Sequence, residues 1–207
     1  MVKMNSEIIV GITQRVDHLI DRGEFRDALD QRMVTWISQA GLVPVAIPNA
    51  LLGDGILSAE PLKDWLKTVR PNALLFSGGN DIGDVPSRDE TEAYLLKWAE
   101  KYRIPVLGIC RGMQMMAVWS GANLKEVSGH VCTQHLIQGD CEGVVNSYHN
   151  FALESCPSGF EVLAKSEDGE IEAIRHVTLP WEGWMWHPER EANFSSRDTD
   201  RLKGLLT

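Results

Sequence analysis

A cysteine between two glycines has the spacing that is typical of a nucleophile. Cys110 lies in Gly108-Ile-Cys-Arg-Gly112, after an apolar run and before a segment of helical character. This pattern predicts a sharp strand-to-helix turn at the cysteine. Glycines suit such a turn because the backbone packs closely on both sides of it. We therefore interpret Cys110 as a nucleophile. The alternative is a buried structural thiol at a strand end.

A helix that begins at this cysteine favours acyl-transfer chemistry. Its first N–H groups and its dipole stabilise the thiolate, which is the reactive form of the side chain. The N–H of Arg111, directly after the nucleophile, is placed to donate to an oxyanion. Ser77-Gly-Gly-Asn-Asp81 offers a second donor, which we expect to be Gly79 N–H, with Gly78 N–H as the alternative. Two other interpretations are a loop that needs positive φ and a phosphate cradle.

The segment Trp186-His-Pro-Glu189 offers a general base and a group that orients it. In an extended segment, residues two apart point the same way, so His187 and Glu189 are expected to lie side by side. Pro188 fixes its own φ and restricts His187. Glu189 can then accept from one imidazole nitrogen while the other faces the thiol. Alone, this segment could be a solvated turn. Together with the predicted strand-to-helix turn at the cysteine, it favours a catalytic triad of Cys110, His187 and Glu189.

The other histidines and cysteines complete no metal-binding motif. His130, Cys132, His135 and Cys141 have spacings close to those of a zinc site, which holds four such ligands tetrahedrally. The sequence has neither a Cys-x-x-Cys nor a His-x3-His anchor, so we expect loop or core residues here, with no metal and no organic cofactor. His149 either lines the pocket or is a half-buried histidine with a backbone partner.

The elements that position these residues are strands and helices that alternate through residue 120. Apolar runs predict strands at residues 7–13, 43–47, 71–76 and 104–108. Helical spacing predicts helices over 25–40, from a cap at Ser58 to 69, and over 91–102, with a charged loop at 14–24. This alternation predicts a parallel sheet with helices on both faces and ligands at the carboxyl ends of its strands.

After Gly121 the sequence changes to short segments separated by turn signals. They predict further strands, several of them antiparallel, at residues 133–138, 143–149, 161–165, 170–176 and 183–186. A closing helix is expected over 198–206. The predicted fold class is α/β, a three-layer αβα sandwich with a mostly parallel sheet and extra antiparallel strands in the C-terminal half. With no repeat and no linker, residues 1–207 are expected to form a single domain.

Composition limits the partners and the compartment. The chain of 207 residues has a net charge of −9, which argues against nucleic acid and anionic membranes as partners, although not against a nucleotide-sized ligand. There is no apolar run long enough to span a membrane, and the N-terminus lacks the apolar core of a signal peptide. Four cysteines without close pairing suit a reducing compartment. We expect a cytoplasmic protein.

The motifs together resemble class I glutamine amidotransferase-like proteins, in particular the free-standing γ-glutamyl hydrolases of the peptidase C26 type. The motifs that carry the resemblance are Ser77-Gly-Gly-Asn, Gly108-Ile-Cys-Arg-Gly-Met-Gln114, Asn146-Ser-Tyr-His149 and Trp186-His-Pro-Glu189. The resemblance implies a flavodoxin-like sheet, the Cys110, His187, Glu189 triad and an oxyanion hole at Gly79 and Arg111. It also implies that the glutamyl group is held by Gln114, Asn146, Ser147, Tyr148 and His149.

The substrate side departs from that pattern. Asn150-Phe151 follow His149 where this branch often has His-Gln, and Met185 stands where a Gln is common. The run Ile12-Thr-Gln-Arg15 and the later segment 26–32 are similar to a subgroup that cleaves γ-glutamyl nucleotide amidates (CDP-amidates) in surface-polysaccharide modification. Cations for a phosphate-bearing leaving group would then be Arg15, Arg22 and Arg32. The alternative for Arg32 is that it lies on the solvated face of its helix.

The resulting hypothesis is a cysteine-dependent hydrolase that cleaves a γ-glutamyl amide, a carbon–nitrogen bond other than a peptide bond, through a glutamyl thioester. Its expected partner is a small-molecule γ-glutamyl substrate. The oligomeric state is left open, with a homodimer as one option. Two rival hypotheses are a glutaminase subunit that delivers ammonia to a separate synthetase, and a non-catalytic binding or redox-sensing domain in which Cys110 is merely oxidised.

Overall fold

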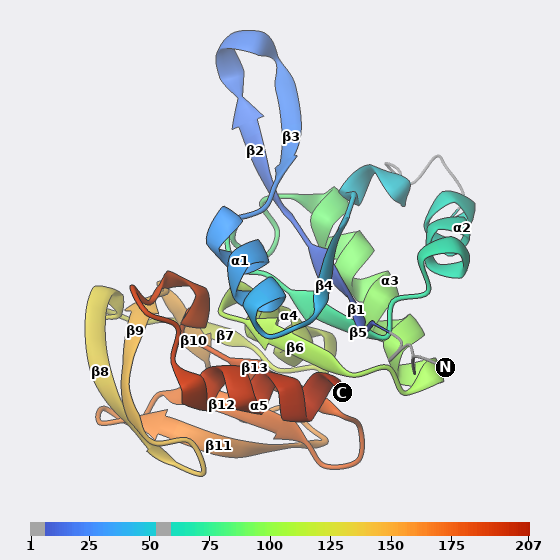
Figure 1. The fold of residues 1–207 in the computed structure, drawn as a ribbon. Coiled ribbons are helices and arrows are strands. Elements are labelled where there is room, and N and C mark those ends of the chain that lie inside the picture. The colour runs from blue at the N-terminus through green and yellow to red at the C-terminus, as the bar shows by residue number, and fades with distance from the viewer. Residues whose placement is uncertain (1–6, 53–58) are drawn as a thin grey trace, which may run out of the picture.

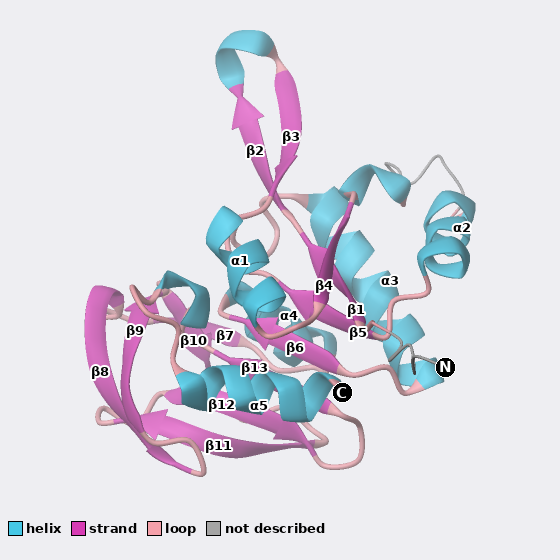
Figure 2. Ribbon diagram, in the orientation of Figure 1, coloured by secondary structure: helices cyan, strands magenta, loops and turns pink. Residues whose placement is uncertain are grey.

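A nine-stranded sheet runs through the computed structural model of the protein, which describes residues 7–52 and 59–207 (Figure 1, Figure 2). The parallel half contains, in spatial order, β4 (Val43–Ile47), β1 (Ile9–Thr13), β5 (Ala73–Phe76), β6 (Val106–Ile109) and β13 (Trp181–Trp184). The antiparallel half continues with β12 (Ile171–His176), β11 (Phe160–Ser166), β8 (Val131–Gly139) and β9 (Gly143–Tyr148).

The parallel strands follow from the apolar runs of the sequence. Every residue of β5 and β6 is buried, as expected for strands that are covered on both faces. The strand predicted at 43–47 has those bounds, and the other three begin two residues later than predicted. The α/β fold class is confirmed, including the antiparallel strands of the C-terminal half.

Helices cover both faces of the sheet and make three layers (Figure 1). The helices α1 (Gln31–Gln39) and α5 (Ser196–Leu206) share one face, where Trp36 Nε1 of α1 donates to Thr199 Oγ1 of α5 at 3.1 Å. The opposite face carries α2 (Glu60–Val69), α3 (Pro86–Tyr102) and α4 (Arg111–Trp119). The predicted cap of α2 at Ser58 lies outside the described residues. None of the described helices is both long and apolar enough to cross a membrane.

The segment after β1 differs from the prediction. A loop to residue 24 and a helix from Phe25 were expected, but β2 (Arg15–Leu19) and β3 (Glu24–Ala28) form an antiparallel hairpin that projects from the sheet (Figure 1). Phe25 is 71% exposed and stacks on His18 across the hairpin, with ring centroids 4.3 Å apart. Its helical spacing is therefore coincidental. The helix begins at Gln31 and is capped by Asp30, whose side chain accepts from Arg32 N–H at 2.8 Å.

The predicted elements after residue 121 are present, with shifted ends. The closing helix α5 begins two residues earlier than predicted, and the strand expected over 183–186 is β13, which ends at Trp184. Two short strands were not predicted: β7 (Leu124–Glu126) and β10 (Phe151–Leu153), which pair as a separate sheet. Because β13 lies beside β6, its carboxyl end brings Trp186 and His187 next to the end of β6.

Candidate active site

Cys110 occupies the sharp turn between β6 and α4. Its φ of 51° and ψ of −107° are strained for a residue with a side chain, and its N–H donates to the Trp184 carbonyl oxygen at 2.7 Å. A Cβ on Gly112 would lie 2.1 Å from the Phe76 carbonyl oxygen, and one on Gly108 would lie 2.6 Å from the Gly112 carbonyl carbon. The two glycines are therefore required by backbone contact, and the predicted strand-to-helix elbow is present.

His187 and Glu189 form a buried pair beside this turn. Nδ1 of His187 lies 2.7 Å from Oε1 of Glu189, and both side chains are almost completely buried. The pairing does not come from an extended strand, as the sequence led us to expect, because Pro188–Arg190 is a 3₁₀ turn that begins at His187. Arg32 of α1 fixes this turn, since its Nε donates to the Glu189 carbonyl oxygen at 2.8 Å. Arg32 is exposed and lines neither cavity near the thiol, so it holds the backbone of this turn instead of a leaving group.

The charge state of His187 is coupled to the thiol. Burial lowers the pKa of His187, but the charge of Cys110, the hydrogen bond with its sulfur and the contact with Glu189 outweigh burial and raise the pKa to about 9. The imidazole is therefore the protonated form at neutral pH. Gly78 allows the ring to approach, because a Cβ there would lie 2.7 Å from Cε1 of His187. An imidazolium beside the nucleophilic thiol is the arrangement that thiol acyl transfer requires.

A cavity of about 110 Å³ lies over the thiol. Cys110, Arg111, Gly79 and His187 all line it, so the structure brings the proposed nucleophile, base and oxyanion donors to one place. Three of the residues predicted to hold the substrate also line it: Gln114, Tyr148 and His149. Its other walls are Asn80, Asp81, Asn150 and Arg190.

Arg88 of α3 orients the glycine loop of this cavity. Its guanidinium is fully buried and donates to three successive carbonyl oxygens, those of Ser77 at 2.6 Å, Gly78 at 3.2 Å and Gly79 at 2.8 Å. The N–H of Gly79 belongs to the same peptide as the Gly78 carbonyl and points the opposite way. Arg88 therefore directs that N–H away from itself. Sequence reasoning missed Arg88, because a single arginine at a helix start carries no motif.

A buried ionic network joins this arginine to the start of α4. Glu92 accepts from Arg88 Nε at 3.1 Å and from Thr13 Oγ1 at 2.7 Å, and its other oxygen pairs with the Arg111 guanidinium, which also pairs with Asp89. Burial, together with the charge of Arg88, lowers the pKa of Arg111 to about 9 against the opposing effect of Asp89. The network therefore holds the two proposed oxyanion donors, at residues 79 and 111, on one rigid frame.

Asn146 and Ser147 do not line the cavity. Both polar atoms of the Asn146 side chain bind the backbone of His187. Nδ2 donates to the His187 carbonyl oxygen at 2.8 Å, and Oδ1 accepts from the His187 N–H at 2.9 Å. Its Nδ2 also lies 2.5 Å from Glu191 Oε1. Ser147 Oγ donates to the His130 carbonyl oxygen at 2.7 Å. The structure therefore places Asn146 behind the base rather than against a ligand.

A second cavity, of about 350 Å³, adjoins the first and shares Gly79, His187 and Arg190 with it. Arg15 lies on its wall with a half-exposed side chain that pairs with Asp17 at 2.8 Å. Arg190, which the sequence analysis did not single out, lies with its guanidinium 4.5 Å from the ring centre of Tyr148. Arg22 is exposed on the hairpin turn and lines neither cavity. Arg15 and Arg190 are thus the two arginines on the wall of this cavity, which Asp17 and Asp30 also line.

The four residues considered as a zinc set do not come together. Cys132 is exposed, and Cys141 is buried near Arg201 and Glu182. His130 and His135, however, lie with ring centroids 4.8 Å apart in a cluster that also contains His149 and Glu172. The carboxylate and His149 were not part of the set drawn from the sequence.

A thiol at a helix N-terminus beside a carboxylate-paired imidazole is the arrangement of cysteine-dependent acyl-transfer enzymes. The family described as Glutamine amidotransferase class-I matches residues 18–200. The protein belongs to this family, as the sequence motifs predicted. The geometry of the site agrees with this family.

Two curated relatives have hydrolase names. The chain is 34% identical over 125 residues to the γ-glutamyl-CDP-amidate hydrolase of Campylobacter jejuni, which covers 58% of this chain and 62% of the relative, less than two thirds of its length. It is 25% identical over 242 residues to the γ-glutamyl-γ-aminobutyrate hydrolase of Escherichia coli O157:H7, covering 99% and 94% of the two chains. These names are consistent with the free-standing hydrolase branch.

A solved structure shares the fold. The glutamine amidotransferase of Thermotoga maritima superposes with a TM-score of 0.66, covering 97% of this chain and 84% of that one at 18% identity. At this identity the likeness concerns the fold alone. It agrees with the three-layer architecture described above.

Proposed function

We propose that the protein hydrolyses a γ-glutamyl amide bond through a thioester on Cys110. The observation that carries the proposal is that Cys110 and the Glu189-paired His187 line one cavity together with Gly79 and Arg111. The hydrolase names of two relatives support the γ-glutamyl group as the acyl part of the substrate.

In the first half of the proposed reaction, the Cys110 thiolate attacks the γ-carbonyl carbon and forms a C–S bond. The carbonyl electron pair moves to the oxygen, where the N–H groups of Gly79 and Arg111 stabilise it. When the C–N bond breaks, the His187 imidazolium gives its proton to the leaving nitrogen. A free amine or amidate leaves, and a glutamyl thioester remains.

In the second half, the neutral imidazole takes a proton from water, which attacks the thioester carbonyl. The C–S bond breaks, glutamate leaves, and the thiolate forms again beside the imidazolium. Glu189 orients the ring throughout and stabilises its positive charge. Each proton and electron pair in these steps is accounted for by the substrate, water and the triad.

In this proposal, each of the two cavities binds one part of the substrate. The smaller one, lined by Gln114, Tyr148 and His149, takes the glutamyl group, whereas the larger one takes the leaving group. Arg15 and Arg190 would bind an anionic leaving group such as the phosphates of a nucleotide amidate in the larger cavity, with Arg15 exchanging its present partner Asp17 for a phosphate. The name of the Campylobacter relative agrees with this leaving group.

A panel of γ-glutamyl amides tests the proposal. Polyamine, aminobutyrate and nucleotide-amidate adducts are incubated with the wild type, with Cys110→Ala and with Cys132→Ala, a matched control at an exposed cysteine. We expect glutamate release by the wild type and by Cys132→Ala but not by Cys110→Ala, and the highest kcat/KM on the nucleotide adduct. Full activity of Cys110→Ala would rule the proposal out.

The principal alternative is a glutaminase subunit that passes ammonia to a synthetase, as membership of the amidotransferase family allows. It predicts weak hydrolysis of glutamine that rises when the partner is added, and no turnover of the larger amides. A non-catalytic redox domain would instead show no covalent labelling of Cys110 by a glutamine-analogue electrophile, and no dependence on His187.

A further inference from the structure

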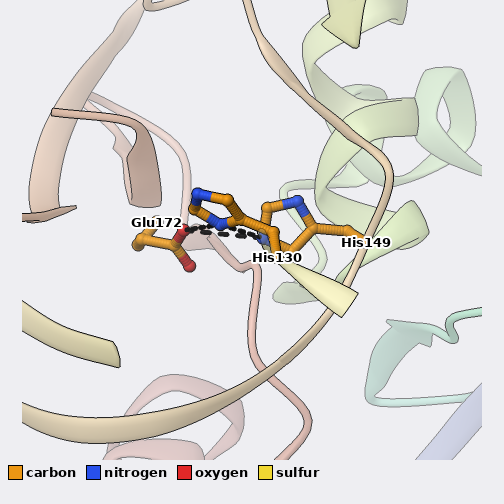
Figure 3. A group of neighbouring side chains, drawn as sticks. All are labelled: His130, His149 and Glu172. Carbon is orange, nitrogen blue, oxygen red and sulfur yellow. Dashed lines mark hydrogen bonds and ion pairs between the residues drawn. The ribbon is translucent and has the colours of Figure 1, made fainter. Parts of the chain in front are cut away.

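Three histidines surround one buried carboxylate in the antiparallel half of the sheet. Glu172 of β12 is fully buried, and its Oε1 lies 3.6 Å from His130 Nδ1, 3.5 Å from His149 Nε2 and 3.3 Å from His135 Nε2 (Figure 3 shows three of these residues). No well-aligned hydrogen bond reaches either Glu172 oxygen from the described residues, although the contact with Glu172 raises the pKa of His135. A buried carboxylate without hydrogen bonds is costly unless a cation compensates its charge.

The outer contacts of two rings fix where their protons lie. His149 Nδ1 is 3.0 Å from the carbonyl oxygen of Phe151, which can only accept, so Nδ1 carries a hydrogen and Nε2 has the lone pair in the neutral, metal-binding form of the ring. His130 Nε2 is 2.8 Å from Asp168 Oδ2, so in the neutral form of that ring the lone pair is on Nδ1. These two lone-pair nitrogens lie only 3.3 Å apart and both face Glu172.

This geometry matches a metal site in size. The three donor atoms, His130 Nδ1, His149 Nε2 and Glu172 Oε1, are separated by 3.3, 3.5 and 3.6 Å. A point equidistant from atoms with these separations lies about 2 Å from each, which is the length of the bonds that Zn²⁺ makes to imidazole nitrogen and carboxylate oxygen, roughly 2.0 to 2.2 Å. The same three residues have ligand atoms that all lie within 4.8 Å of one another.

We propose that His130, His149 and Glu172 bind a divalent transition-metal ion, with Zn²⁺ as the expected occupant. Two imidazole nitrogens and one carboxylate oxygen favour Zn²⁺ over Ca²⁺ or Mg²⁺, which prefer oxygen ligands. The ion removes the repulsion between the facing lone pairs and balances the charge of Glu172. Asp168 and the Phe151 carbonyl orient the two ligating rings from outside, as is usual for metal-bound histidines.

The position of the site gives the ion a structural role. His130 precedes β8 and His149 follows β9, whereas Glu172 is on β12, which is separated from β8 in the sheet by β11. An ion bound here links strands that do not pair with each other. His149 also lines the cavity over Cys110 and follows Tyr148, so the ion would hold one wall of that cavity in place. The proposal does not rest on the proposed hydrolysis, and no step of that reaction uses the ion.

Metal analysis tests the site directly. The protein is purified without a metal-affinity tag and its zinc is counted by mass spectrometry in the Cys110→Ala background, so that the catalytic thiolate cannot supply the ligand. We expect about one Zn²⁺ per chain. Glu172→Gln and His149→Gln in the same background should lower the count at least tenfold, whereas the control His18→Gln, on the exposed hairpin, should leave it unchanged.

A second measurement keeps the test valid if the variants fold poorly. Zinc is removed from the Cys110→Ala protein with a chelator, and Co²⁺ is added while the visible d–d absorption is followed. We expect the melting temperature to fall on removal and to recover on stoichiometric addition of Zn²⁺. Folded protein that takes up neither ion would overturn the proposal, since a shared proton would then satisfy the cluster. So would an unchanged zinc count in Glu172→Gln and His149→Gln.

Discussion

Arg88 Nη1 donates a hydrogen bond to the carbonyl oxygen of Gly79 at 2.8 Å, from a side chain that is fully buried. The same guanidinium binds the two preceding carbonyl oxygens, so the peptide planes of the glycine loop are fixed before a substrate arrives. An oxyanion donor that needs no reorganisation stabilises the transition state most effectively. We therefore regard Arg88 as a positioning residue of the proposed reaction.

Arg88→Lys should lower kcat with little change in KM. Lysine keeps the charge but cannot bind three carbonyl oxygens from one plane, so the Gly79 donor loses its alignment. Loss of one oxyanion donor costs about 10²- to 10³-fold in kcat, and we expect a partial loss of about 10- to 100-fold. Alkylation of Cys110 by iodoacetamide forms no oxyanion and should proceed at the wild-type rate. An equal fall in both rates would mean that the substitution disrupts the whole site.

Asn146→Asp decides between two roles for this residue. The sequence pattern assigned Asn146 to substrate binding, whereas its amide binds the His187 backbone on both sides. The substitution removes the donor to the His187 carbonyl, and we expect kcat to fall about 10-fold, because a lost buried hydrogen bond costs about 1 to 3 kcal/mol. Steady-state kinetics give the answer. A raised KM with unchanged kcat would indicate that Asn146 binds the substrate instead.

Arg15→Gln and Arg32→Gln should have different effects. Arg15 lies on the wall of the larger cavity, so its loss should reduce kcat/KM about 10-fold for a phosphate-bearing substrate and leave γ-glutamyl-aminobutyrate unaffected. Arg32 holds the carbonyl oxygens of Glu189 and Glu191, so its loss should reduce activity on every substrate. The kcat/KM of each variant is measured with both substrates. An equal loss of kcat/KM on both substrates in Arg15→Gln would contradict the assigned role of Arg15 in leaving-group binding.

The raised pKa of His187 predicts the pH dependence. A pKa of about 9 in the folded chain, against an ordinary value of 6.5, means that the imidazolium stabilises the fold fully below about pH 6.5. This stabilisation is lost as the pH rises through about 9. We expect kcat/KM to fall over the same upper range, because the imidazolium protonates the leaving nitrogen.

Chemical unfolding at several pH values checks the stability part. The difference in the free energy of unfolding between the wild type and His187→Gln should be largest below about pH 6.5 and should shrink as the pH rises toward about 10. A difference that stays constant across this range would contradict the raised pKa of His187 in the folded protein.

The elbow and the strands that carry it were predictable from sequence because each depends on local residue types. Cys110 between its glycines, and the apolar runs before it, encode the turn without help from distant residues. The hairpin at 15–28 was not predictable in this way, since Phe25 mimics a helical spacing and is exposed in the fold. Tertiary contacts, not the pattern, decide where α1 begins.

The roles of Arg88, Asn146 and the histidine cluster depend on contacts between distant segments. Arg88 binds the loop at 77–79, Asn146 binds His187, and Glu172 contacts histidines from the segments before β8 and after β9. No spacing in the sequence encodes such contacts. The cytoplasmic location, the single domain and the oligomeric state stay predictions.

Trapping of the acyl-enzyme tests the central claim most directly. Wild-type protein is mixed with a γ-glutamyl nucleotide amidate, quenched in acid within one turnover and analysed by peptide mass spectrometry. We predict a glutamyl group bound as a thioester to the peptide that contains Cys110, and its absence in Cys110→Ala. Release of glutamate with no acyl group on Cys110 at any quench time, and with unchanged turnover by Cys110→Ala, would contradict the account.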